Sequence, residues 1–260
     1  MSGFWHLADR TKRRLFNRLR NAFHRIDYLS LSYDEYSRSI EKIYDDIIDE
    51  WKQIESELSR SPPKVVKRLR GFLFETLFYY SCLKVECIFK NAELLEMAGL
   101  KFKEHPPWFE ATPLYDIVPM LHHLKEDGKT VRKSPQTLAD FLVTYVDDLG
   151  PHPPSLIDVK SKKPSKWSDS WEWCYIAAMR RGFIFQIAYP RGEKCLPRDL
   201  EEWEVVTPCP SCKNFSKNYR ICQYCGQVIY PYTIVDAIYG IREALSKITS
   251  LKNGESTGKK

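Results

Sequence analysis

Four cysteines near the C-terminal end constrain this chain more than any other feature of its sequence. Cys209 and Cys212 form one C-x2-C pair, Cys222 and Cys225 form a second, and nine residues separate the two pairs. Zn²⁺ prefers four ligands in a tetrahedron, and each C-x2-C turn can direct two thiolates at one ion. Gly226, directly after the second pair, eases the tight backbone of such a turn. The spacing predicts a structural zinc site in a small ribbon, since four protein ligands leave no open position for a substrate.

Two disulfides, or four unrelated thiols, are the alternatives to this zinc site. A reducing compartment favours the metal. The first residues, MSGFWHLADR, lack the apolar stretch and cleavage site of a secretory signal, so we expect a cytoplasmic protein. No apolar run approaches the roughly 20 residues that cross a bilayer, and we therefore expect no membrane-spanning segment.

Residues 1–62 are predicted to form a helical N-terminal extension. Leu15, Phe16, Leu19 and Phe23 recur at helical spacing, and apolar residues continue this pattern between 36 and 58. The first of these segments is also strongly basic. Its cations are Arg10, Lys12, Arg13, Arg14, Arg18, Arg20 and Arg25. They could meet phosphates, or they could form the solvated face of an ordinary packed helix.

The segment from 63 to 205 is predicted to form an α/β core. A long, largely buried helix is expected from about 64 to 98, followed by short apolar runs with turn signals between them, which are typical of strands. The expected strands are 113–122, 140–146, 155–161 and 183–190, with a capped helix between the last two that starts at Ser168 or Asp169 and ends at Gly182. The second and third strands should pair antiparallel. The zinc ribbon and a final helix (233–249) should occupy 206–250, and 251–260 should be a flexible tail.

A group of acidic residues and one lysine falls on these predicted core elements. Asp158 and Lys160 stand two apart on a strand, which places them on the same face. Asp140 opens the strand expected to pair with it, and Glu75 is an acid within an otherwise apolar helix. Converging carboxylates with a nearby cation are what a Mg²⁺-dependent phosphodiesterase needs.

These residues resemble the motifs of the PD-(D/E)XK nuclease superfamily, which includes type II restriction enzymes and archaeal Holliday junction resolvases. The resemblance rests on Glu75 in GFLFETLF, Asp140 in ADFLV, and Asp158 with Lys160 in LIDVKSK, although Ala139 stands where the family motif has Pro. It covers about half the chain and implies a restriction-endonuclease-like αβββαβ core.

The resemblance also implies roles for these side chains. Asp140, Asp158 and Glu75 would bind Mg²⁺ or Mn²⁺, and Lys160 would orient the attacking water and stabilise the developing charge. Asp116 is a rival for the first metal carboxylate. Ordinary structural roles are the alternative: a surface pair for Asp158 and Lys160, a capping role for Asp140, and a salt bridge to Arg68 or Arg70 for Glu75.

The formal charge of +6 favours a polyanionic partner. Basic residues that could contact nucleic acid follow the predicted catalytic strand and lie on the ribbon. They are Lys162, Lys163, Lys213, Lys217 and Arg220. On the ribbon, Phe215 and Tyr219 stand among them, as in surfaces that stack bases. The plainer interpretation is that the ribbon braces the neighbouring domain and that the lysines lie in solvated turns.

Together these features predict a Mg²⁺-dependent DNA endonuclease with a structural zinc ribbon. RNA is not excluded as a substrate, and cutting both strands of a duplex would favour a homodimer. A non-enzymatic nucleic-acid-binding or adaptor protein, with the ribbon as its working part, is the alternative.

Overall fold

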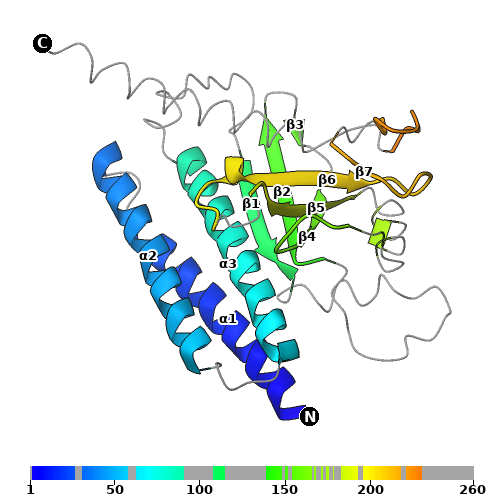
Figure 1. The fold of residues 1–260 in the computed structure, drawn as a ribbon. Helices are drawn as coiled ribbons and strands as arrows, with labels where there is room; N and C mark the ends of the chain where they lie inside the picture. Colours follow the sequence, from blue (N-terminus) through cyan, green and yellow to red (C-terminus); the bar gives the residue numbers. More distant parts are fainter. Residues whose placement is uncertain are drawn as a thin grey trace, which may run out of the picture.

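The computed structural model describes residues 2–26, 31–57, 63–90, 108–114, 139–147, 150–151, 154–165, 167, 171, 174–175, 178, 183–192, 196–217 and 221–229. Three helices come first and a mixed sheet follows, so the chain is of the α/β class (Figure 1). A four-cysteine cluster lies near the C-terminal end of this part. Asp116, Arg220, the predicted helix at 233–249 and the predicted tail lie outside the described residues.

The helices are α1 (Ser2–His24), α2 (Tyr33–Glu57) and α3 (Pro63–Lys90). A capping box starts α2, because the Glu35 carboxylate accepts hydrogen bonds from the backbone N–H (3.0 Å) and the hydroxyl (2.7 Å) of Ser32. Pro63 occupies the first position of α3, where its missing N–H costs nothing. The helices predicted from apolar spacing are thus present, although residues 91–98 of the predicted long helix lie outside the described residues.

The strands are β1 (Trp108–Pro113), β2 (Phe141–Asp147), β3 (Gly150–Pro151), β4 (Ser155–Val159), β5 (Ile184–Pro190), β6 (Trp203–Pro208) and β7 (Phe215–Ser216). They follow the order β1-β2-β4-β5-β6-β7, with β3 paired to β2. Of these neighbours, β4 and β5 are parallel and the others are antiparallel. A parallel pair needs a crossover, and the described residues between β4 and β5 include the helical Trp171, Cys174, Tyr175 and Ala178.

The sheet confirms one predicted pairing and includes strands that were not predicted. Strands β2 and β4 pair antiparallel, as predicted, with Phe141 opposite Ile157. The strand β1 ends at Pro113, where the predicted strand 113–122 begins, and residues 115–122 lie outside the described residues. The segment of β1, WFEATP, alternates between buried and more exposed positions, yet it is too polar to stand out as an apolar run. The strand β6 was not predicted, and it runs from the sheet directly into the first cysteine pair.

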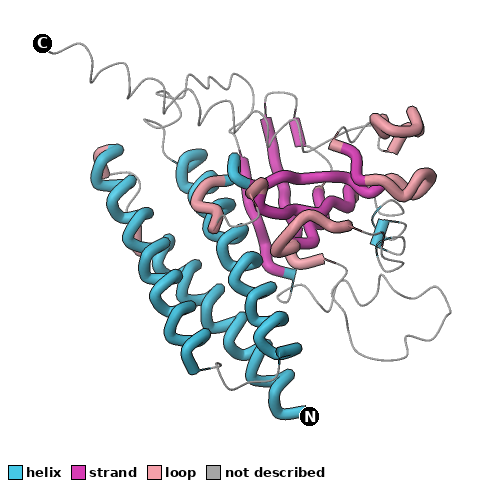
Figure 2. The backbone as a smooth tube through the Cα atoms, in the orientation of Figure 1, coloured by secondary structure: helices cyan, strands magenta, loops and turns pink. Residues whose placement is uncertain are grey.

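One apolar core joins the three helices to the sheet. Its members come from α1, α2, α3 and the strands, and Figure 2 shows the helices gathered on one side of the sheet. Phe141 at the start of β2 is fully buried, and its ring lies 5.7 Å from that of Phe16 on α1 and 5.4 Å from that of Phe78 on α3. The packing of Phe141 fixes the position of Asp140, the residue before it.

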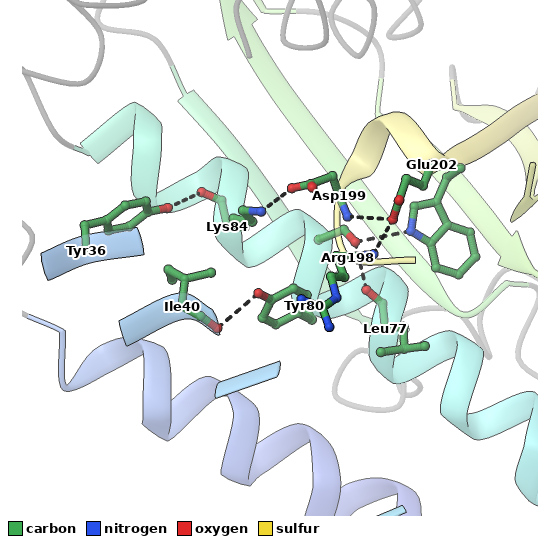
Figure 3. Close-up of polar contacts among 10 residues, drawn as sticks. Tyr36, Ile40, Leu77, Tyr80, Lys84, Arg198, Asp199 and Glu202 are labelled. Atoms are coloured by element: carbon green, nitrogen blue, oxygen red, sulfur yellow. Dashed lines mark hydrogen bonds and ion pairs between the residues drawn. The ribbon is translucent and has the colours of Figure 1, made fainter. Parts of the chain in front are cut away.

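The segment that leads into β6 is fastened to α3 (Figure 3). Lys84 forms an ion pair with Asp199, and the Lys84 carbonyl accepts a hydrogen bond from the Tyr36 hydroxyl of α2 at 3.0 Å. The Trp203 indole N–H donates to the Ser81 hydroxyl at 3.2 Å, and both residues are buried. These contacts hold the last long strand of the sheet, and with it the entry to the cysteine cluster, against the helices.

Candidate metal centres

The four predicted zinc ligands converge in space. The Sγ atoms of Cys209 and Cys225 lie 3.7 Å apart, those of Cys212 and Cys222 lie 3.5 Å apart, and all four lie within 4.8 Å of one another. Thiolates in a tetrahedron about 2.3 Å from a central Zn²⁺ are separated by about 3.8 Å. The described cysteines are free thiols and form no disulfide. The cluster therefore fits a structural zinc ion.

The two C-x2-C turns have the same backbone geometry. The residue after each pair donates its N–H to the first cysteine of that pair: Lys213 to the Cys209 carbonyl at 2.9 Å, and Gly226 to the Cys222 carbonyl at 2.8 Å. Both adopt positive φ, 60° for Lys213 and 72° for Gly226. Glycine takes this conformation without penalty, as expected for Gly226, whereas Lys213 adopts it at a steric cost.

The acidic residues singled out in the sequence also come together. Asp140 lies directly before β2; its backbone N–H donates to the Ile157 carbonyl at 2.9 Å, and its Oδ2 accepts the backbone N–H of Val159 at 2.8 Å. Asp158 lies on β4, and its carboxylate forms a 2.7 Å ion pair with Lys160. The acid of α3, Glu75, is buried and reaches the same place from the helix side.

A residue that the motif analysis did not single out lies among these acids. Lys12 of α1 forms an ion pair with Glu75, and its Nζ lies 3.6 Å from Asp140 Oδ1. Its position could have been found from the sequence, because it precedes Leu15 and Phe16 by three and four residues and so belongs to the buried face of α1. We call Glu75, Asp140, Asp158 and Lys160 the acidic cluster, and Lys12 is bound between two of its acids.

The alternative salt bridge of Glu75 to Arg70 is wrong. Arg70 instead binds the Glu55 carboxylate of α2, with an Nη2 to Oε1 distance of 2.9 Å. The side chain of Arg68, the other alternative partner, lies outside the described residues. The counter-ion of Glu75 is therefore a lysine from a different helix.

Burial and mutual repulsion perturb the acids of this cluster. Burial, and then the charge of Asp140, raise the pKa of Glu75 to about 7. The same two causes, in the same order, raise the pKa of Asp158 to about 6. Burial opposes the charge of Lys12 and Lys160, yet the surrounding carboxylates raise the pKa of both above the ordinary value. The three carboxylates of the cluster formally outnumber the two ammonium groups of Lys12 and Lys160.

A tryptophan connects the acidic cluster to the cysteine ribbon. The Trp171 indole N–H donates to Asp158 Oδ2 at 3.0 Å. Its ring packs edge-on against Phe215 of β7, with centroids 5.5 Å apart, and at a similar angle against Trp167 at 6.4 Å. Lys213, within the first cysteine turn, lies 4.6 Å above the Trp167 ring. Nothing in the spacing of the sequence indicated this contact, because it depends on the tertiary packing of β7 on the crossover segment.

The predicted nucleic-acid contacts fall in different surroundings. Lys162 and Lys163 are exposed in the bend after β4, next to the acidic cluster. Lys217 pairs with Glu204 at 2.5 Å. In the basic N-terminal stretch, Arg14 and Arg18 bind Glu50 of α2 at 2.9 and 2.5 Å. Part of that stretch therefore serves the packing of the helices.

Among the helices that the structure describes, none is both long and apolar enough to cross a membrane. No protein-family model, curated protein or solved structure matches this chain.

Proposed function

We propose that this protein is a Mg²⁺-dependent nuclease that hydrolyses phosphodiester bonds in DNA. The observation that carries the proposal is that Glu75, Asp140, Asp158 and Lys160, which come from three separate segments, meet in one largely buried cluster. Carboxylate oxygens are the ligands that Mg²⁺ prefers, and a lysine beside them suits charge stabilisation at a phosphate.

The order of the elements supports the same proposal. Helix α3 is followed by the strands β1, β2 and β4, a crossover with helical residues, and β5, with the small β3 in the turn between β2 and β4. This is the αβββαβ order of the PD-(D/E)XK superfamily. Glu75 lies on α3, Asp140 directly before β2, and Asp158 near the end of β4, in the order that this resemblance implies.

In the proposed mechanism, Asp140 and Asp158 would hold the metal directly and Glu75 would complete its coordination directly or through water. The bound Mg²⁺ would supply Lewis-acid activation of the scissile phosphate and of the attacking water. Lys160 would orient that water and stabilise the charge that develops on phosphorus-bound oxygens. Lys162 and Lys163, exposed beside the cluster, would hold the substrate backbone.

A cleavage assay on supercoiled, linear and branched DNA, with a single-stranded RNA alongside, tests this function. We expect cutting that needs added Mg²⁺ or Mn²⁺ and that falls at least about a hundredfold in Asp158→Ala and Lys160→Ala. Asp46→Asn, on an exposed acid of α2, is the matched control and should cut like the wild type. Full activity in Asp158→Ala would refute the assignment.

A second candidate is a non-enzymatic binding role for the ribbon. Its second cysteine turn presents large apolar side chains to solvent, with Ile221 49%, Tyr224 58% and Val228 58% exposed. Exposed aromatic and apolar groups of this kind suit base stacking or a protein partner. This role predicts salt-sensitive binding of DNA without turnover, weakened by Tyr224→Ala and unaffected by Asp158→Ala.

A further inference from the structure

We propose that Lys12 is a built-in cation that occupies the acidic cluster in the metal-free protein and leaves Asp140 when a divalent metal binds. The inference rests on the proposed metal-binding role of the cluster and adds to it a competitor supplied by the chain itself. Lys12 belongs to α1, outside the segment that carries the nuclease-like motifs.

The contacts of Lys12 place its charge where a metal would lie. Its ammonium forms an ion pair with Glu75 and lies 3.6 Å from Asp140 Oδ1. Both acids are among the three that would coordinate Mg²⁺. In the described part of the chain, the four cysteines lie close enough together to hold an ion, whereas the three carboxylates do not. Lys12 bridges two of these carboxylates instead.

The charges of the cluster favour exchange over simultaneous occupancy. Three carboxylates against the single ammonium of Lys160 leave a formal charge of −2. A divalent ion balances that charge completely, whereas Lys12 balances half of it. With both present the cluster would carry an excess positive charge in a buried place, which is costly. The cluster is therefore occupied best by the metal or by Lys12, but not by both.

The surroundings of Lys12 allow it to move. Its Nζ lies 5.3 and 5.6 Å from the centroids of the Phe72 and Phe16 rings. Its side chain keeps 16% of its surface exposed, so the ammonium has a route to water along these rings. A flexible four-carbon stem can take that route without a shift of α1.

Binding of Mn²⁺ to the zinc-loaded, full-length protein tests the exchange, with free Mn²⁺ measured by electron paramagnetic resonance. In Lys12→Met, which keeps the apolar stem, we expect the Kd for Mn²⁺ to fall at least about tenfold, because the competing charge is gone. Lys12→Arg should retain a Kd near that of the wild type. Lys42→Met removes an exposed lysine of α2 and serves as the matched control, with no change expected.

Footprinting of the wild type gives a second measurement that needs no variant. Acylation of lysines, followed by mass spectrometry, should show Lys12 protected without divalent metal and modified several-fold faster with saturating Mg²⁺, with Lys42 as the internal reference. An unchanged acylation rate at Lys12, or an unchanged or higher Kd for Mn²⁺ in Lys12→Met, overturns the exchange. If Asp158→Asn still weakens Mn²⁺ binding in that case, the metal site itself stands. Absence of Mn²⁺ binding in the wild type overturns the exchange and the proposed nuclease site together.

Discussion

At the scale of single residues, Glu75 is a buried acid of the acidic cluster whose ionisation is opposed by its surroundings. It is 8% exposed, and two further carboxylates lie near enough to oppose its ionisation. The ion pair with Lys12 favours the charged form, but burial and the charge of Asp140 outweigh it, so the pKa of Glu75 rises to about 7. In the metal-free protein this carboxyl group is therefore partly protonated near neutral pH.

The raised pKa of Glu75 predicts how stability depends on pH in the metal-free, zinc-loaded protein. The ordinary pKa is 4.5, so between about pH 5 and 7 the folded state holds a proton that the unfolded state has lost. The folded state therefore binds more protons there, and its stability falls as the pH rises through this window. In Glu75→Gln we expect a flatter dependence, measured as urea midpoints from pH 5 to 8. Parallel profiles for the two proteins would contradict this.

At the scale of elements, the cysteine ribbon and the acidic cluster are coupled by aromatic packing. The ribbon strand β7 supplies Phe215, which packs on Trp171, and Trp171 hydrogen-bonds Asp158 on β4. The strand β6 carries the ribbon and is itself fastened to α3 through Trp203 and Ser81. A bound zinc ion that orders the ribbon would thus also restrain Asp158, a proposed ligand of Mg²⁺. We regard Trp171 as a positioning residue for that ligand.

Trp171→Phe tests this coupling, because it keeps the ring that packs on Phe215 and removes the N–H that holds Asp158. Loss of such an outer contact typically costs roughly 10- to 100-fold in metal affinity or activity. We expect the Kd for Mn²⁺ to rise by roughly tenfold, with the zinc content unchanged. The matched control is Trp203→Phe, which loses its N–H contact to Ser81 and should lower thermal stability while leaving the Mn²⁺ Kd at its wild-type value.

At the scale of the whole molecule, the helices and the sheet depend on one another. The rings of Phe16, Tyr79 and Phe141 come from α1, α3 and β2 and lie 5.4 to 5.7 Å apart. All three belong to the same apolar core. Helix α1 thus supplies part of the core of the sheet as well as Lys12, which binds two acids of the acidic cluster.

The shared core predicts one cooperative unfolding transition for the helices and the sheet. Phe16 is 1% exposed, and Phe16→Ala should lower the free energy of unfolding by roughly 3 to 5 kcal/mol. Circular dichroism and tryptophan fluorescence should shift together. Asn21→Ala, at an exposed position of α1, should change the free energy of unfolding by less than about 0.5 kcal/mol. Separate transitions for the two signals would show that α1 packs independently.

The parts of this molecule that depend on local spacing can be predicted from its sequence. Cys209 and its three partners, the helices α1 to α3 and the pairing of β2 with β4 follow from short-range patterns. Features that depend on contacts between distant segments could not be predicted in this way. Lys12 looked like one cation among many in a basic stretch, and its role depends on where α1 packs. The metal-binding and catalytic roles of Asp140, Asp158 and Glu75 remain predictions.

The order in which the acidic cluster is assembled has a consequence during synthesis on the ribosome. Lys12 and Glu75 emerge early, but Asp158 lies on β4, which is enclosed between β2 and the later strand β5. Long-range contacts of this kind form late, because much of the chain must be ordered before they bring any gain. A nascent chain that has not reached β5 therefore lacks the strand that encloses Asp158 on one side. Under the proposed nuclease function, this topology would keep the acidic cluster incomplete until β5 has been synthesised.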